Sequence, residues 1–299
     1  MCVDIQQLRI FCSVAGEENL TRAAEKLHLS APSVSARIKA LEEFLEVQLF
    51  VRSARGMFLT EAGHALWQEA EGILSRVDQL RDRVRTSDDA VSGTIRLAIN
   101  NPPEVIRFDA LLKALVAQYP NLNLETSFGN SVENLRKLLG EQVDFCFFEG
   151  PIENANLEAI PLTRQELILV APAKWEIDWA EVLPQALEEH PWIFMSEGCS
   201  CFTAAKNWAA GHGLRLKSQI RNCPNDLTTL SYVAGGMGVS VISRKALELY
   251  HDRKSIAIVP CFSESVLLSF VFRKGTEGYR RGAVVIDEVC RVWGLEEAP

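Results

Sequence analysis

Two hydroxyl side chains and then two cationic ones occupy every second position of a short stretch near the N-terminus, at Ser33, Ser35, Arg37 and Lys39. A hydroxyl can bond to a phosphate oxygen or to the edge of a base, and the planar fork of arginine matches guanine or phosphate. If one helix carries these residues, they can contact one partner together. We therefore interpret the stretch as a surface that binds double-stranded DNA.

Two short helices joined by a tight turn would position this surface. Ser30 is placed to cap the second helix, and Pro32 fits its first turn, where a backbone N–H would have no partner. The pattern predicts a helix-turn-helix whose second helix enters the major groove. An ordinary helical hairpin with a solvated polar face is the alternative. Apolar residues recur at helical spacing in both helices, at Leu20, Ala23, Ala24 and Leu27 and again at Val34, Ile38 and Leu41.

A first helix over residues 4–16 would complete the core of this module, and a small wing would follow the hairpin. The wing consists of two extended pieces, 47–50 and 58–60, with Arg52 and Arg55 in the turn between them. Wing arginines commonly contact the DNA backbone or a minor groove, although either one could equally be polar surface. We expect DNA to be bound by Thr21, Ser30, Pro32, Ser33, Ser35, Arg37, Lys39, Arg52 and Arg55.

A long helix is predicted from residue 60 to about residue 86. Its apolar residues recur every three or four positions, and its flanks carry charges of both signs. Such a narrow stripe needs a partner that buries it, and we expect a second copy of the same helix and hence a homodimer. Packing of the helix on its own domain is the alternative. The expected dimerisation residues are Leu66, Ile73, Val77, Leu80 and Val84.

Strands and helices alternate after a polar segment at residues 86–93. The first part has a β-α-β-α-β order, which predicts a parallel, doubly wound sheet. Extended segments at 157–162 and 167–171 then lead into a second, similar set of strands and helices. The sequence thus predicts an α/β fold after the helical N-terminus.

Polar residues gather in the loops that follow the predicted strands, where open α/β sheets bind ligands. A helix N-terminus with Ser131, or with Ser200 and Thr203, is a ready anion site. We therefore expect a small anionic effector, such as an organic acid. For any single residue, helix capping alone is the alternative. The expected effector-binding residues are Asn100, Asn101, Asn130, Ser131, Glu149, Ser196, Cys199, Ser200, Cys201, Thr203 and Asn225.

Cys199 and Cys201 are close together at a predicted helix N-terminus, where the pKa of a thiol is lowered and its reactivity is raised. A redox- or metal-sensing role, with Cys223 as a third thiol, is therefore an alternative to a packing role. The eight cysteines of the chain are otherwise scattered, and without a secretory signal they are expected to be reduced thiols.

Composition, charge and the motifs present indicate what class of protein this is. The 299 residues are 47% hydrophobic and 23% charged, which is ordinary for a soluble globular protein, and no apolar run approaches the ~18 residues of a membrane span. The net charge of −8 argues against indiscriminate nucleic-acid binding, whereas residues 1–58 are neutral, with seven Lys/Arg and seven Asp/Glu. No catalytic or phosphate-binding motif is present. We expect a cytoplasmic protein that is not an enzyme and has no cofactor, metal or membrane partner.

Residues 11–63 resemble the N-terminal module of the LysR-type transcriptional regulators. Many members of that family carry Gln where this chain has Ala31, which leaves the preferred operator open because alanine offers at most a methyl contact. The glycine-rich segment Gly235–Gly238 also fits, and the resemblance extends over essentially the whole chain. The matching motifs are Leu20–Leu27, Ser30, Pro32, Val34–Ser35, Ile38, Leu41–Glu42, Leu49–Arg52 and Leu59–Gly63.

This resemblance implies a regulator that binds promoter or operator DNA as a dimer, or as a tetramer of two dimers, with RNA polymerase as a further partner. Its second half is expected to resemble a periplasmic binding protein, with an effector cleft between two lobes. The expected domains are a winged helix-turn-helix over 1–59, a dimerising linker helix over 60–88, lobe I over 89–162 and 267–299, and lobe II over 163–266. A solute-binding or enzymatic α/β protein with a helical interaction module is the alternative from another class.

Overall fold

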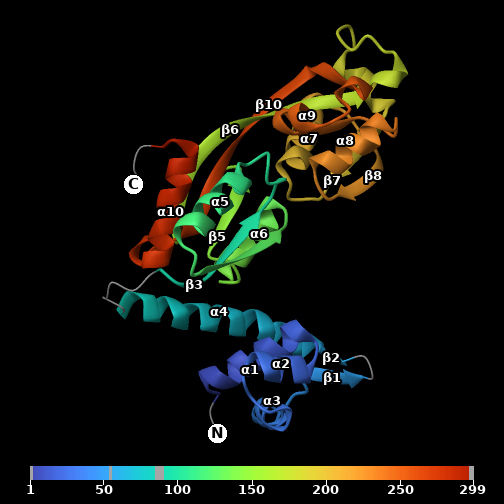
Figure 1. Cartoon of the computed structure of the whole chain (residues 1–299). Coiled ribbons are helices and arrows are strands. Elements are labelled where there is room, and N and C mark those ends of the chain that lie inside the picture. The colour runs from blue at the N-terminus through green and yellow to red at the C-terminus, as the bar shows by residue number, and fades with distance from the viewer. Residues whose placement is uncertain (1–2, 54–55, 85–90, 296–299) are drawn as a thin grey trace. The chain divides into compact units, whose positions relative to one another are not determined.

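The computed structural model describes residues 3–53, 56–84 and 91–295. The chain divides into two compact units, Met1–Ser87 with Leu139–Gln142, and Asp88–Leu138 with Val143–Pro299. Within the described ranges, no helix combines the length and the apolar character that a membrane span requires. Figure 1 follows the chain from its blue N-terminus to its red C-terminus.

The first unit contains the predicted helix-turn-helix and wing, which are therefore confirmed. Phe11, Val34 and Ile38 are fully buried where α1, α2 and α3 pack together. The wing strands β1 and β2 pair in antiparallel fashion. The elements of this unit are α1 (Ile5–Glu17), α2 (Leu20–Lys26), α3 (Ala31–Leu45), β1 (Phe50–Ser53), β2 (Gly56–Leu59) and α4 (Glu61–Val84).

Polar side chains determine where the two hairpin helices begin. Asn19, rather than Thr21, caps α2, because its Oδ1 accepts hydrogen bonds from two backbone N–H groups of that helix. Ser30 caps α3, since its Oγ accepts from the N–H of Ser33 at 3.3 Å. Pro32 lies in the first turn of α3, as expected for a residue without an N–H.

The second unit alternates strands and helices around one large sheet and one strand pair. The strand order in the large sheet is β4-β3-β5-β10-β6-β9, and β7 pairs with β8. The elements are β3 (Gly93–Ile99), α5 (Phe108–Gln118), β4 (Leu122–Phe128), α6 (Ser131–Leu139), β5 (Phe145–Glu149), β6 (Leu157–Pro172), β7 (Pro191–Met195), α7 (Ser200–Gly211), β8 (Lys217–Cys223), α8 (Asp226–Ala234), β9 (Ser240–Ser243), α9 (Arg244–Leu249), β10 (Ile256–Arg273) and α10 (Arg280–Trp293).

Two long strands, β6 and β10, run through both lobes of this unit (Figure 1). Lobe I contains β3, β4 and β5, and lobe II contains β7, β8 and β9. The parallel sheet predicted from the first part of the α/β sequence is confirmed for β3, β4 and β5, and β10 joins this sheet antiparallel to β5. In lobe II, β6 is in turn antiparallel to β9. Strand β6 therefore runs in the same direction as the parallel strands of lobe I and opposite to β9 in lobe II. Strand β10 runs in the same direction as β9 and opposite to β5 in lobe I.

The segments predicted as two extended pieces at 157–162 and 167–171 form the single strand β6. Its pairing with β10 continues from Leu157 to Pro172, with two register shifts. The apolar pattern is interrupted at residues 163–166 because most of these side chains are exposed where the strand passes between the lobes. The interruption therefore marks the crossing point and not a loop.

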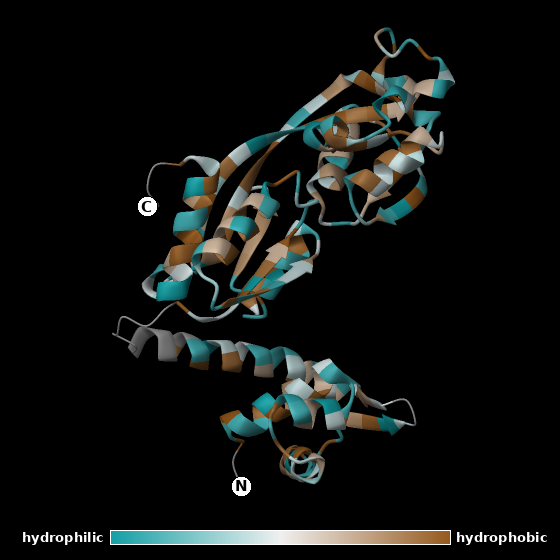
Figure 2. Cartoon of the chain, in the orientation of Figure 1, coloured by the Kyte–Doolittle hydropathy of each residue, from teal (hydrophilic) through white to brown (hydrophobic). Residues whose placement is uncertain are grey.

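Aromatic side chains from β5 and β10 pack together in lobe I, and the C-terminal helix α10 packs on the same lobe. The rings of Phe145 and Phe270 stack with centroids 5.1 Å apart, and Phe147 meets Phe270 edge-on at 5.3 Å. Helix α10 packs against α5, so residues near 290 complete a lobe that begins near residue 93. Figure 2 shows hydrophobic segments along the strands of this unit and a mostly hydrophilic α4 in the first unit.

Candidate functional site

Helix α3 presents one polar face to solvent. Its opposite face is buried in the core of the first unit, at Val34 and Ile38. Pro32, Ala36 and Lys39 are exposed on the outward face. The predicted residues Ser33 and Ser35 are half-buried on the two flanks of this face, and Arg37 is half-buried closer to the core. Ala36 is thus at the centre of the surface, as its position on the outer face of the predicted helix implies, although it is absent from the list of expected DNA contacts.

The wing and α3 form one continuous surface. Arg52 Nη2 donates to the hydroxyl of Ser35 at 3.1 Å, which joins β1 to α3. Glu42 Oε1 accepts from the N–H groups of Leu49 and Phe50 at 2.8 and 3.2 Å, which fixes the chain between α3 and the wing. These bonds hold a cation beside the exposed face of α3. Arg55 is outside the described residues.

The helix-turn-helix also exposes hydroxyl side chains at the starts of both of its helices. The side chains of Thr21, near the start of α2, and Ser30, at the cap of α3, are both exposed. N–H groups in the first turn of a helix attract phosphate oxygens. The exposed Lys39 forms an ion pair with Glu43 at 3.5 Å, one turn further along α3. The surface therefore combines hydroxyls, cations and helix N-termini, which is the chemistry of a DNA-backbone contact.

The apolar stripe of α4 divides between two environments. Leu66 is half-buried against the core of the first unit, and Ala70 and Leu74 are buried in it. In contrast, Ile73 and Leu80 are 45% and 61% exposed. Of the remaining predicted dimerisation residues, Val77 is half-buried, whereas the side chain of Val84 is outside the described residues. The alternative of packing on its own domain thus applies to the first half of α4.

A cavity of about 220 Å³ lies between lobes I and II. Nine of the eleven predicted effector-binding residues line it: Asn100, Asn101, Asn130, Ser131, Glu149, Ser196, Cys199, Cys201 and Asn225. Ser200 and Thr203 do not. The Ser200 hydroxyl instead donates to Glu149, and the exposed Thr203 donates to the carbonyl of Cys199 at 3.1 Å within α7.

Several further residues line the cavity that are absent from the list of expected effector-binding residues, although some of them belong to the predicted loops at 129–131 and 223–226. They are Phe128, Gly129, Glu133, Met195, Cys223, Pro224, Asp226 and Ser243. Asp226 directly follows the predicted Asn225 in the first turn of α8 and ends the loop at 223–226 that the sequence places after a strand, at the ligand edge of the sheet. Ser243 caps α9, which has only six residues, and a helix that short carries no clear apolar period.

Within the described residues, hydrogen bonds join the lobes across the cavity at two places. Glu149, at the end of β5 in lobe I, accepts from the hydroxyl of Ser200 in lobe II. Its other oxygen, Oε1, accepts from Nδ2 of Asn101 at 2.6 Å. Asn130 Nδ2 in lobe I donates to the carbonyl of Glu197 in lobe II at 3.2 Å. The residues that line the cavity therefore also hold the two lobes together.

The cavity contains two carboxyl groups in a poorly solvated environment. Burial raises the pKa of Glu149, although the hydrogen bonds from Ser200 and Asn101 oppose this rise. Asp226 is 3% exposed, and burial together with the nearby charge of Glu149 raises its pKa to about 7. Among the described residues, none that lines the cavity is Lys, Arg or His. This charge pattern argues against the anionic effector predicted from the loops.

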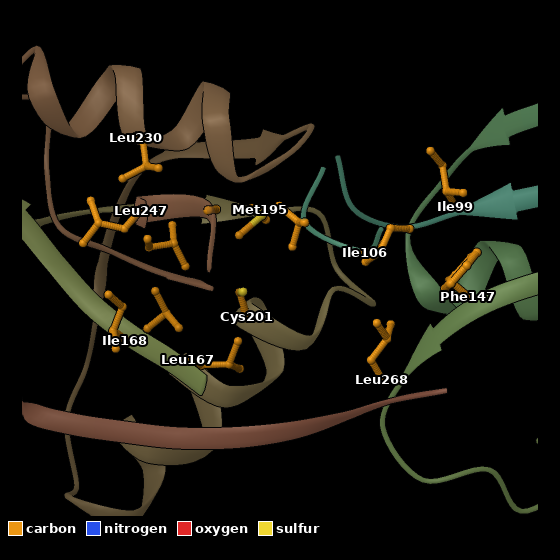
Figure 3. Packing of buried hydrophobic residues seen from close by; sticks show 14 of the residues in the cluster. Ile99, Ile106, Phe147, Leu167, Ile168, Met195, Cys201, Leu230, Leu247 and Leu268 are labelled. Carbon is orange, nitrogen blue, oxygen red and sulfur yellow. The ribbon is translucent and has the colours of Figure 1, made fainter. Parts of the chain in front are cut away.

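Cys201 fits the packing role and not the alternative of a reactive thiol. Cys201 is 5% exposed and packs between residues such as Met195 and Leu167 (Figure 3). The hydrogen bond with Cys199, burial and the charges of Asp226 and Glu149 raise the pKa of Cys201 well above its ordinary value. The lowered pKa predicted from the helix N-terminus is therefore wrong for Cys201, because these effects outweigh the helix.

Metal binding has no support in the described part of the chain, which contains no group of three or more His, Cys, Asp or Glu side chains that could hold an ion. Burial also raises the pKa of the Cys223 thiol, the third member of the predicted cluster. A thiolate is the form of cysteine that binds metal, so the raised pKa opposes this use of the cluster.

Two family models match the chain. One is described as the LysR substrate binding domain and matches residues 88–280. The other is described as a bacterial regulatory helix-turn-helix protein of the lysR family and matches residues 5–64. The two matched segments correspond to the α/β unit with its cavity and to the winged helix-turn-helix.

Relatives of similar length match over most of the chain. The HTH-type transcriptional regulator CysL of Bacillus subtilis is 30% identical over 267 residues, covering 88% of this chain and 89% of CysL. The HTH-type transcriptional regulator YofA of Bacillus velezensis is 27% identical over 272 residues, covering 89% and 90%. These relatives are transcriptional regulators.

Solved structures show the same fold. A full-length OxyR from Pseudomonas aeruginosa has a TM-score of 0.69 at 20% identity, with all of both chains covered. CbnR, a LysR family transcriptional regulator, has a TM-score of 0.65 at 22% identity and covers 97% of this chain and 99% of its own. CbnR in complex with its target DNA has the same TM-score and identity.

Proposed function

The chain belongs to the LysR family of DNA-binding transcriptional regulators, and we propose that a small molecule bound between lobes I and II changes its binding to operator DNA. One observation supports this proposal: the residues that line the cavity also make the hydrogen bonds that join the lobes, as Glu149 does with Ser200. A ligand there alters these bonds. It shifts the protein between two arrangements only by its difference in affinity for them.

The proposal includes a specific contact surface for DNA. We place the N-terminal end of α3 in the major groove, with Pro32, Ala36 and Lys39 toward the duplex and the wing on the backbone. Ala31, in the first turn of α3, offers a methyl group to thymine in place of a hydrogen bond. The proposed contacts remain Thr21, Ser30, Pro32, Ser33, Ser35, Arg37, Lys39, Arg52 and Arg55, with Ala36 added.

We further propose that the regulator works as a dimer, or as a tetramer of two dimers. Ile73 and Leu80 support this, because both are exposed on α4 and would be buried against a second copy. The division into residues 1–59, 60–88, 89–162 with 267–299, and 163–266 is part of the proposal. So are RNA polymerase as a partner at the promoter and a location in the cytoplasm, where bacterial chromosomal DNA lies.

An effector-binding regulator is better supported than a thiol-responsive one. The raised pKa of Cys201 keeps this thiol neutral near pH 7, and oxidation proceeds through the thiolate. Because the chain belongs to this family, the alternative of a solute-binding protein that does not bind DNA is excluded.

Selection from a pool of random duplexes tests the DNA-binding part of the proposal. The full chain is expected to enrich a sequence with two half-sites spaced by about one helical turn or a multiple of it. Fluorescence anisotropy on the enriched duplex should show binding that weakens steeply as the salt concentration rises. If no sequence is enriched over a scrambled control, then the proposal of operator binding is wrong.

The effector part needs a separate readout. A thermal-shift screen with small metabolites identifies compounds that raise the melting temperature of the full chain, and each is then added to the enriched duplex with the protein. We expect at least one compound to change DNA affinity by about fivefold or more, the lower end of typical coupling between sites. Compounds that bind in the cavity without changing DNA affinity contradict control by an effector.

A further inference from the structure

We infer that the cavity binds its small molecule through a protonated amine, which contacts the carboxyl group of Asp226 with Glu149 close by. This inference rests on the proposed function, because it names the chemical class of effector for the same cavity. It also replaces the anionic effector predicted from the loops with a cationic one.

Unpaired acceptor atoms are the first support. Asp226 is 3% exposed, and its Oδ1 has no hydrogen-bond donor in the described structure. Oδ1 of Asn100, across the cavity in lobe I, is likewise buried without a donor. Among the described lining residues, the buried side-chain atoms left without a partner are acceptors only. A buried acceptor without a donor loses the hydrogen bonds that it makes to water in the unfolded chain, and a ligand that brings N–H groups restores them.

The second support is the balance of charge. Asp226 and Glu149 are close enough for the charge of Glu149 to raise the pKa of Asp226. No lysine, arginine or histidine among the described lining residues compensates for them. An anionic ligand would add a further negative charge beside these carboxyl groups, and its desolvation would be uncompensated. An ammonium group supplies both the missing positive charge and several N–H donors.

The size of the cavity limits what can carry the amine. About 220 Å³ is smaller than the roughly 300–1,000 Å³ of pockets for drug-sized ligands, so the molecule is small. Phe128, Met195 and Pro224 contribute apolar surface to the wall. A short aliphatic chain can therefore lie against them while its amine reaches Asp226. An inorganic ion fits less well, since the described residues offer no set of three metal ligands.

Three probes of nearly equal size separate these chemistries. n-Butylamine, n-butanol and butyrate differ mainly in the charged or polar group at one end. With the full chain at constant ionic strength, we expect n-butylamine to raise the melting temperature and to bind at least tenfold more tightly in calorimetry than the other two. Equal or tighter binding of butyrate or butanol overturns the inference. So does an equal response to sodium, potassium or magnesium chloride.

A matched pair of variants locates the amine. Asp226→Asn keeps the shape of the side chain and removes its charge, and it should weaken n-butylamine binding about tenfold or more. Asp109→Asn makes the same change at the first turn of α5 in the same unit and should leave binding unchanged. If Asp226→Asn does not fold, then Glu149→Gln serves in its place, with an expected loss of severalfold. Unchanged binding in the folded variant overturns the inference.

The outcomes for the inference and for the proposed function remain distinct. If butyrate binds in the cavity and changes affinity for the selected duplex, then the amine is wrong and control by an effector stands. If n-butylamine binds through Asp226 but neither it nor longer amines change DNA affinity, then the amine site stands and the proposed control fails. Both results come from the same full-length protein.

Discussion

Lys39 and Lys113 are closely matched side chains in different units of the protein. Their side chains are 74% and 81% exposed, and each pairs with a carboxylate one helical turn away, at 3.5 and 3.3 Å. Only Lys39 lies on the proposed DNA surface. The two residues therefore allow one cation to be removed from α3 and an equivalent cation to be removed elsewhere.

We predict that Lys39→Ala weakens DNA binding by a similar factor for all sequences, because a phosphate contact carries no base information. The slope of log K against log salt should become shallower by about 1 for each subunit bound. Lys113→Ala should leave both quantities unchanged. Anisotropy titrations from 50 to 200 mM salt measure the slope, and equal effects of the two variants would exclude Lys39 from the DNA contact.

The ionisation of Asp226 should make the free energy of unfolding depend on pH. Its pKa is about 7 in the folded chain and about 3.8 when the side chain is free, so the folded state binds more protons between these values. The free energy of unfolding should therefore fall as the pH rises through this range and level off above pH 7. Between pH 5.5 and 8 the expected loss is about 2 kcal/mol.

Urea unfolding of the full chain at these two pH values measures the effect. Asp226→Asn should remove most of the loss, because the amide does not ionise. Asp109→Asn should keep it. The raised pKa of Glu149 acts in the same direction, so a smaller slope should persist in Asp226→Asn. A loss of the same size in wild type and in Asp226→Asn would disprove the role of this carboxyl group.

Local sequence predicted most of the cavity wall but not its charge. Asn101 and Ser131 could be placed because each follows a predicted strand, and the ends of parallel strands share one edge of a sheet. Asp226 lies in a predicted loop, yet its burial depends on how α8 packs against strands such as β6 and β7, and its electrostatic neighbour Glu149 is distant in sequence. The pKa of Cys201 was mispredicted for the same reason, since the neighbours that raise it include Glu149 and Asp226.

Helix α4 shows a similar limit at the level of the element. Its apolar spacing continues over the whole helix, and this regularity predicted one continuous dimer seam. The structure uses Ala70 and Leu74 to complete the core of the first unit and leaves Ile73 and Leu80 exposed. Periodicity reveals which residues share a face but not which neighbour covers that face. The same reasoning explains β6, whose polar crossing was mistaken for a break.

The exposed part of α4 leads to a prediction about assembly. Leu80→Asp should shift the protein from dimer to monomer, because a carboxylate would be buried in the proposed interface. Gln68→Asp introduces the same residue at an exposed position of the same helix and should leave the dimer intact. Sedimentation velocity at micromolar concentration distinguishes the two. Identical sedimentation of both variants would rule out the second half of α4 as the seam.

At the scale of the whole molecule, the lobes are joined by few polar contacts across the cavity. The Ser200 hydroxyl is one of them, and we predict that Ser200→Ala increases amide hydrogen exchange around the cavity by about threefold to tenfold, as a lost hydrogen bond of about 1 kcal/mol implies. Ser231→Ala removes a hydroxyl that donates to Leu227 and accepts from Tyr250, both in lobe II, and should not have this effect. Hydrogen-exchange mass spectrometry is the measurement, and equal exchange in both variants would contradict a lobe-joining role of Ser200.

Charge is also distributed unevenly over the whole molecule. Residues 1–58 are neutral, so the net charge of −8 lies beyond them. Attraction to DNA must therefore come from a few positioned cations, such as Lys39 and Arg52, and not from a general positive potential. The sequence alone was sufficient for this conclusion, because it requires only a count of residues.

The return of β10 and α10 to lobe I has a consequence for the order in which a new chain acquires its properties. The buried core of the first unit uses residues 8–74, whereas lobe I is incomplete until residues up to 293 have been made. At about 5–20 residues per second, translation separates these two points by roughly 10–40 s. During that interval a nascent chain can fold its DNA-reading module while its cavity does not yet exist. Under the proposed function, each newly made molecule would thus be able to hold DNA before it could respond to an effector.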